Sequence, residues 1–122
     1  MNYNIRKINK GGQDVDIIYL NKEKTIIFKI DEDVDHHNVQ EIRRRADYKI
    51  ERRLPKRVIF DFNNVSFMDS AGIGMLIGRY KTVNLIGGKL EVANISKSIE
   101  KIFEMCGILK LIPVINYEEK VG

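Results

Sequence analysis

A short apolar run in the middle of the chain sets the strongest limit on its fold. Residues 57–62 (RVIFDF) are mostly β-branched or aromatic, and two asparagines follow the run directly. A run of this kind is typical of a strand that is buried on both faces of its sheet. Such a sheet needs other elements, usually helices, to cover it. The run therefore predicts a central strand in a layered fold.

Strand-like and helix-like segments alternate around this strand. Two β-rich runs separated by a polar turn predict a hairpin over 16–20 and 25–30. Apolar residues at helical spacing predict three helices, over 37–50, 71–85 and 96–106. Two further strands are predicted, over 89–93 and 109–115. Together these segments predict an α/β fold: a single domain with a mixed, largely parallel β-sheet of four to five strands and crossover α-helices.

The two ends of the chain add to this domain. Residues 1–15 form an extension that would suit one more strand and a glycine turn, through Tyr3, Ile5, Ile8, Gly11 and Gly12. At the other end, Asn116 and Glu119 have the spacing of a capping box, which predicts a final helical turn. Because 122 residues are too few for two cores, we expect one domain at 16–117 and a short tail at 118–122.

Composition excludes several classes of protein. The chain is 43% hydrophobic and 31% charged, and it has no apolar run near the length of about 18 residues that a membrane span needs. Its first residues lack the apolar core of a secretory signal, so we expect a cytoplasmic protein. The single cysteine, Cys106, excludes an internal disulfide and a cysteine-rich zinc site. Its spacing in the third helix predicts a buried thiol.

Two charged clusters favour ordinary surface roles. The net charge of +4 is dispersed, and the arginine run at 43–45 predicts a solvated helix face, with no nucleic-acid site. Residues 31–37 (DEDVDHH) begin like a calcium loop, but His36 and Ile42 replace its glycine and glutamate. We therefore expect no metal here, and Asp35 or Asn38 should cap the first helix.

Residues 67–74 (FMDSAGIG), at a strand-to-helix junction, are the densest candidate site. A dinucleotide loop would need a third glycine where Ile77 stands, and the hydrolase elbow would need glycine where Met68 stands. No bound cofactor is therefore expected. Helix capping by Asp69 or Ser70 is compatible with every alternative. A phosphate on Ser70 would meet the positive end of the helix dipole, so this hydroxyl suits reversible phosphorylation.

The helix after this junction also predicts a docking face. Gly72, Met75 and Arg79 fall on the side away from the apolar stripe of Ile73, Ile77 and Tyr80. A solvent-exposed methionine is an adaptable contact for a partner. We therefore expect these three residues to be exposed in line with Ser70.

The segment 65–74 (VSFMDSAGIG), continued by 77–81 (IGRYK), resembles the STAS-domain anti-sigma factor antagonists of bacteria. An Asp-His-His sequence at 35–37 upstream and the glycine pair at 87–88 downstream extend the likeness over about residues 16–117. The resemblance is strongest to the anti-sigma-F antagonists of endospore-forming bacteria. It departs from their pattern at Ala71, where a second hydroxyl is common, and at Glu32 and Asp33, where a Gly-Glu pair is common.

The resemblance implies a switch protein and not an enzyme. In this family the serine at the position of Ser70 is phosphorylated by an anti-sigma factor that is itself a serine kinase. The unmodified form binds that kinase and frees the sigma factor, and a serine phosphatase restores it. Carried over, the partner-binding surface would include Asp35, His36, Asp69, Ala71, Gly72, Met75 and Arg79. The alternatives are an unphosphorylated STAS-like module for ligand sensing or scaffolding and, further off, a nucleotide-binding enzyme.

Overall fold

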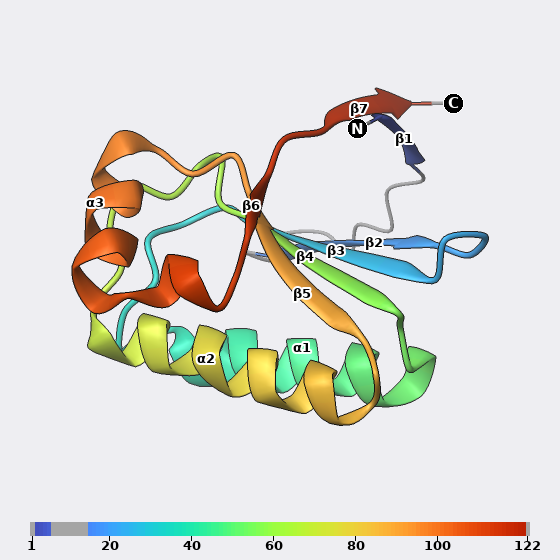
Figure 1. Ribbon diagram of the computed structural model, residues 1–122, viewed down its shortest axis with the longest axis horizontal. Coiled ribbons are helices and arrows are strands. Elements are labelled where there is room, and N and C mark those ends of the chain that lie inside the picture. Colours follow the sequence, from blue (N-terminus) through green and yellow to red (C-terminus); the bar gives the residue numbers. More distant parts are fainter. Residues whose placement is uncertain (1, 6–14, 122) are drawn as a thin grey trace.

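The computed structural model describes residues 2–5 and 15–121, and its main feature is a five-stranded sheet (Figure 1). The strands lie in the order β2-β3-β4-β5-β6. β2 and β3 form the predicted antiparallel hairpin, and each later pair is parallel. Their bounds are β2 Val15–Leu20, β3 Thr25–Ile30, β4 Arg57–Asp61, β5 Lys89–Ala93 and β6 Val114–Ile115. The predicted mixed, largely parallel sheet is confirmed.

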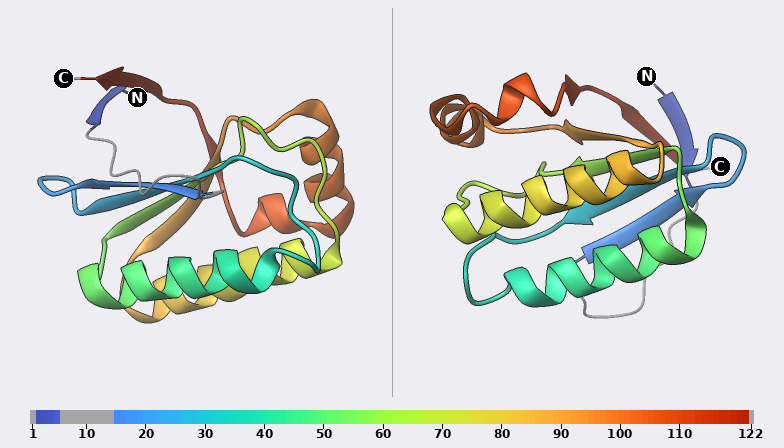
Figure 2. Two further views of the ribbon diagram at one scale, coloured as in Figure 1. Left: turned by 180° about the vertical axis from the view of Figure 1, so that it is seen from behind. Right: turned by 60° about the horizontal axis from the view of Figure 1, so that its bottom comes forward.

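Two long helices cover one face of this sheet side by side, as Figures 1 and 2 show. They are α1 (Val39–Arg53) and α2 (Ser70–Leu85), and they follow the loops after β3 and β4. A third helix, α3 (Lys97–Cys106), packs at the end of the sheet from which these loops emerge. The predicted apolar stripe of α1 is confirmed, because Ile42, Ala46 and Ile50 are buried.

The core fills both faces of the sheet. Between the sheet and the helices, the tilted rings of Phe28 and Phe60 pack with centroids 5.1 Å apart, and Leu76 and Phe103 are fully buried. A smaller apolar cluster occupies the opposite face and contains Ile18, Leu20, Ile27, Ile59, Ala93 and Tyr117. The run 57–62 is buried from Val58 onward, which explains why it lacks the alternation of a half-exposed strand.

The C-terminal segment differs from prediction. In place of a strand over 109–115, the chain forms a 3-10 turn at Ile108–Lys110, and β6 contains only two residues. Gly107, with φ of 75°, turns the chain after α3, and Ile108 and Ile112 then reach the core as a helical pair. The helical turn expected at Asn116 and Glu119 is also wrong.

The chain ends meet in a second, two-stranded sheet. β7 (Glu118–Val121) pairs in parallel with β1 (Asn2–Ile5), above the main sheet in Figure 1. The strand predicted through Tyr3 and Ile5 is therefore present, whereas Ile8, Gly11 and Gly12 lie outside the described residues. Pairing across the whole length of the chain has overridden the local capping pattern at Asn116.

Candidate functional site

The site is built where the loops after β3 and β4 run side by side. Val34 and Met68 form a parallel bridge between the two loops. The N–H of Val34 donates to the carbonyl of Phe67 at 3.1 Å, and the N–H of Asp69 donates to the carbonyl of Val34 at 3.1 Å. Backbone pairing therefore fixes the chain immediately before Ser70.

Asp33 joins the two loops through its side chain. Its Oδ1 accepts hydrogen bonds from the N–H of Ser66 at 2.8 Å, the N–H of Phe67 at 3.1 Å and the hydroxyl of Ser66 at 3.1 Å. These bonds, chiefly that from the Ser66 N–H, hold the pKa of Asp33 below its ordinary value. Sequence reasoning missed this role, because it depends on contacts 33 residues away.

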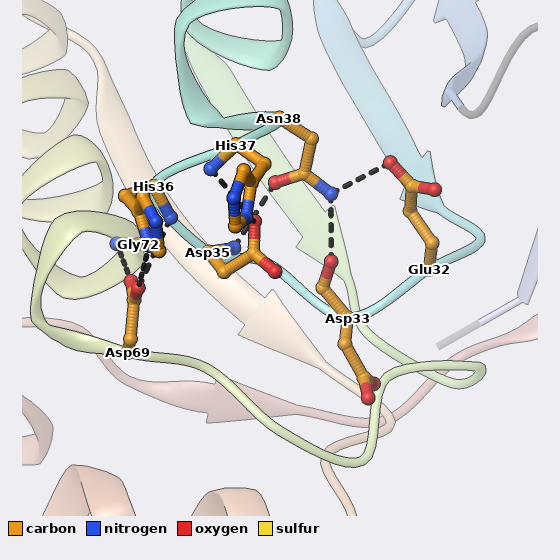
Figure 3. A network of polar contacts seen from close by, with 8 residues as sticks. All are labelled: Glu32, Asp33, Asp35, His36, His37, Asn38, Asp69 and Gly72. Carbon is orange, nitrogen blue, oxygen red and sulfur yellow. Dashed lines mark hydrogen bonds and ion pairs between the residues drawn. The ribbon is translucent and has the colours of Figure 1, made fainter.

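Asp69 caps α2 and also binds the first loop (Figure 3). Its Oδ1 accepts the N–H of Gly72 at 3.1 Å, which confirms the predicted cap. Its Oδ2 accepts the backbone N–H of His36 at 3.0 Å and lies 3.4 Å from the Nδ1 of that ring. The bond from Gly72 is the main cause that lowers the pKa of Asp69. One carboxylate therefore orients both the helix and the neighbouring loop.

The loop before α1 is closed by side chains that do not cap the helix. Oδ1 of Asp35 accepts the N–H of His37 at 2.8 Å. Asn38 occupies the cap position, but its side chain makes no cap bond. Its amide instead accepts the N–H of Asp35 at 3.0 Å and donates to Glu32 and to the carbonyl of Asp33 (Figure 3). The predicted capping of α1 by a side chain is wrong. The side chains of Asp35 and Asn38 instead stabilise the loop before the helix.

Ser70 is the first residue of α2, and its side chain is exposed. It lies on the wall of an apolar hollow of about 340 Å³ between α2 and α3. The hollow is lined by Met68, Asp69, Ser70, Ile73, Ile102, Met105 and Cys106. Met105 is 87% exposed, and Phe67 nearby in sequence is 52% exposed. An exposed hydroxyl at a helix N-terminus thus adjoins apolar surface on α3, which the sequence motif did not indicate.

Cys106 is exposed, so the predicted buried thiol is wrong. It is the last residue of α3, and its Sγ donates to the carbonyl of Phe103 at 3.5 Å. Ile99 and Phe103 already fill the core side of this short helix. The predicted helical spacing is present, but the core ends before the last turn of the helix.

The docking face predicted on α2 is wrong as an exposed surface. Gly72, Met75 and Arg79 are all buried, and Ile73, Ile77 and Tyr80 are half-buried. The reason is that α2 packs against α1 as well as against the sheet, so it buries two faces. A Cβ on Gly72 would overlap Met68 and would lie 3.0 Å from Cγ1 of Val34, so this glycine allows the helix start to pack on both loops.

The other predicted residues lie in the loop before α1 and at the start of α2. His36 is exposed and its backbone N–H donates to Asp69, Asp35 is half-buried directly before His36 in the chain, and Ala71 is half-buried next to Ser70. Within the described residues no group of three or more His, Cys, Asp or Glu side chains could hold a metal ion. None of the helices in this part of the chain has the length and apolar character needed to cross a membrane.

Comparison with known proteins assigns the chain to a family. A model of the STAS domain matches residues 17–121, nearly the whole described region. The chain belongs to the STAS family. The anti-sigma F factor antagonist of Paenibacillus polymyxa is 31% identical to this STAS domain over 93 residues, which cover 76% of this chain and 80% of that protein. The predicted membership among anti-sigma factor antagonists is therefore confirmed.

Solved structures show the same fold. The anti-sigma factor antagonist SpoIIAA in its unphosphorylated form superimposes with a TM-score of 0.71 at 24% identity, covering 84% of this chain and 86% of that one. The Bacillus cell fate determinant SpoIIAA in its phosphorylated form gives a TM-score of 0.65 at 24% identity, covering 84% and 89%. The STAS domain described above is thus similar to structures of both forms of one antagonist.

Proposed function

We propose that this STAS domain is a phosphorylation-controlled binding protein. Its unmodified form binds an anti-sigma factor that is also a serine kinase, and this binding releases the sigma factor. Phosphorylation of Ser70 ends the binding until a serine phosphatase removes the phosphate. The chain acts by binding and not by catalysis, in the cytoplasm, without a cofactor and without contact to nucleic acid or membrane.

The observation that carries this proposal is the setting of Ser70. The residue is exposed, it starts α2, and the preceding Asp69 is fixed by two backbone hydrogen bonds. A kinase can therefore reach the hydroxyl without unfolding its surroundings. One solved structure with the same fold, that of SpoIIAA, is of a phosphorylated form, so a protein of this fold can carry a phosphate.

A phosphate on Ser70 would act on the partner more than on the fold. It adds close to two negative charges at the start of α2, where the helix dipole favours them. The same charges would line the apolar hollow between α2 and α3. A partner that buries an apolar side chain in this hollow would have to desolvate the phosphate, which is costly. We expect the contacts around it to include Asp35, His36, Asp69 and Ala71.

The test is phosphorylation by the cognate anti-sigma kinase with ATP, followed by intact mass and peptide mapping. Wild type should gain one phosphate on Ser70, and Ser70→Ala should gain none. Ser98→Ala is the matched control, because Ser98 is also exposed and lies near the same loops, where it donates to the carbonyl of Ser66. It should be modified like wild type.

Two results would contradict the proposal. One is an unmodified wild type under conditions in which the kinase phosphorylates a reference substrate. The other is equal modification of Ser70→Ala. If the unmodified wild type still binds the kinase in the first case, the protein is a binding module that is not controlled through this serine.

A further inference from the structure

A groove between α1 and α2 begins beside Ser70 and is separate from the apolar hollow. Its volume is about 340 Å³, and its lining includes Val39, Arg43, Ala71, Gly74, Gly78 and Arg79. Ala71 directly follows Ser70, so one end of the groove adjoins the proposed phosphorylation site. The two helices whose residues line the groove run side by side (Figure 2).

The groove carries an excess of positive charge. Asp47 pairs with both arginines: its Oδ1 lies 2.9 Å from Nε of Arg79, and its Oδ2 lies 3.7 Å from Nε of Arg43. One carboxylate therefore faces two guanidinium groups. Arg44, the next residue in α1 after Arg43, has its own partner in Glu41 and does not line the groove.

Arg79 is an unusual residue for the floor of a groove. It is only 6% exposed, and its Nε and Nη1 make no hydrogen bond among the residues that the structure describes, although Nε lies 2.9 Å from the Asp47 carboxylate. Burial lowers the pKa of Arg79 while Asp47 raises it, but a guanidinium stays charged at neutral pH. A buried charged donor without a partner costs free energy, which a second carboxylate would recover.

The glycines that line the groove leave room for another chain to approach. A Cβ placed on Gly74 or Gly78 would meet nothing within 4 Å, so the space above both glycines is open. An aspartate or glutamate side chain has the charge that complements the two arginines, and the guanidinium fork binds carboxylates well.

We propose that this groove receives an acidic side chain of the anti-sigma factor, from the segment that docks around Ser70. The inference rests on the proposed function and names the chemistry of the partner. It also gives a second reason for the switch, because a phosphate on Ser70 would repel an acidic segment that enters the groove next to it. The groove would favour a partner with an acidic side chain at this place, and the phosphate would repel that side chain.

The test measures the affinity of the unphosphorylated protein for its cognate anti-sigma factor by titration calorimetry. Arg43→Glu should weaken binding on the order of tenfold or more, because it reverses a charge that faces the acidic group. Arg44→Glu is the matched control: it makes the same charge change one residue away, outside the groove, and should bind within about twofold of wild type. The difference between the two variants should shrink at high salt.

A second variant tests the groove without changing charge. Gly74→Leu places a side chain in open space and removes a glycine from a helix, so it should fold at least as stably as wild type. It should nevertheless lose affinity for the anti-sigma factor.

A titration with inorganic phosphate tests whether the groove binds a free anion instead. Binding is followed by NMR through the Nε–H signals of Arg43 and Arg79.

The outcomes separate this inference from the proposed function. Normal binding by wild type and equal binding by Arg43→Glu, Arg44→Glu and Gly74→Leu would overturn the acidic contact and leave the proposed function intact. If inorganic phosphate binds saturably while Gly74→Leu binds the anti-sigma factor like wild type, the groove is a site for a small anion. This result would also overturn the acidic contact. Failure of wild type to bind the anti-sigma factor would overturn both.

Discussion

Asp33 is the side chain on which the loop before Ser70 depends most. Its Oδ1 accepts three hydrogen bonds from Ser66 and Phe67. We expect Asp33→Ala to lower the free energy of unfolding by about 1–2 kcal/mol, because the bonds are charge-assisted but partly exposed to water. Asp31→Ala is the control, since Asp31 accepts one bond from Asn64 and should cost at most about 0.5 kcal/mol. Urea unfolding of both variants measures the difference, and equal losses would contradict the role of Asp33.

The same carboxylate makes stability depend on acid pH. Hydrogen bonds lower the pKa of both Asp33 and Asp69 in the folded state. The stabilisation is therefore complete above the unfolded pKa of about 4 and is lost as the pH falls through the folded values. At pH values below about 4, the midpoint temperature of thermal unfolding of wild type should fall. The difference in midpoint temperature between wild type and Asp33→Ala should become smaller in the same pH range. A gap that stays constant from pH 7 to pH 3 would show that Asp33 acts without its charge.

At the scale of single residues, the sequence predicted local roles and missed distant ones. The cap by Asp69 and the exposed serine after it follow from a strand-to-helix motif that lies within a few residues. Asp33 and Asp47 act on residues more than 30 positions away, so no local pattern identifies them. Cys106 was predicted to be buried because helical spacing shows which side of a helix a residue lies on. The spacing does not show how far along the helix the core extends.

At the scale of elements, α2 is the helix whose environment the sequence described least well. It buries one side on the sheet and another on α1, so Gly72, Met75 and Arg79 are enclosed and not free for docking. Its residues are apolar or small on nearly every side, so the sequence does not distinguish a buried apolar face from an exposed polar one. In contrast, α1 has one clear apolar period, and both α1 and strands β2 to β5 were predicted to within about three residues of their ends.

The glycines of α2 provide a matched test of this packing. Gly72→Ala should destabilise the protein by about 1 kcal/mol, because the new methyl group forces the buried Met68 to move and so outweighs the gain in helix propensity. Gly74→Ala should instead stabilise it by up to about 1 kcal/mol, since nothing lies within 4 Å of the added Cβ. Thermal unfolding of the two variants provides the measurement. The same sign for both changes would mean that α2 does not pack on the loops at Gly72.

At the scale of the whole molecule, the C-terminal segment shows where local patterns fail. The parallel pairing of β1 with β7 joins residues that are more than 110 positions apart, and no periodicity in either segment indicates a partner. The site is different, because it needs only the loops after two neighbouring parallel strands. Such loops emerge at the same edge of a sheet, which explains why the Asp35 and Ser70 segments, grouped in the sequence analysis by the family resemblance, lie close together.

This arrangement predicts that charge at Ser70 controls binding while the fold stays the same. Ser70→Asp adds a negative charge at the first residue of α2, where the dipole favours it, so its thermal midpoint should stay within about 3 °C of wild type. This variant should no longer bind the anti-sigma factor, because the added charge borders the apolar hollow and lies next to Ala71, which lines the groove between α1 and α2. Ser70→Asn is the matched control, with the same shape and no charge, and it should bind more tightly than the aspartate. Calorimetric titration at neutral pH compares them. Equal affinities of the two variants would show that size at position 70, and not charge, excludes the partner.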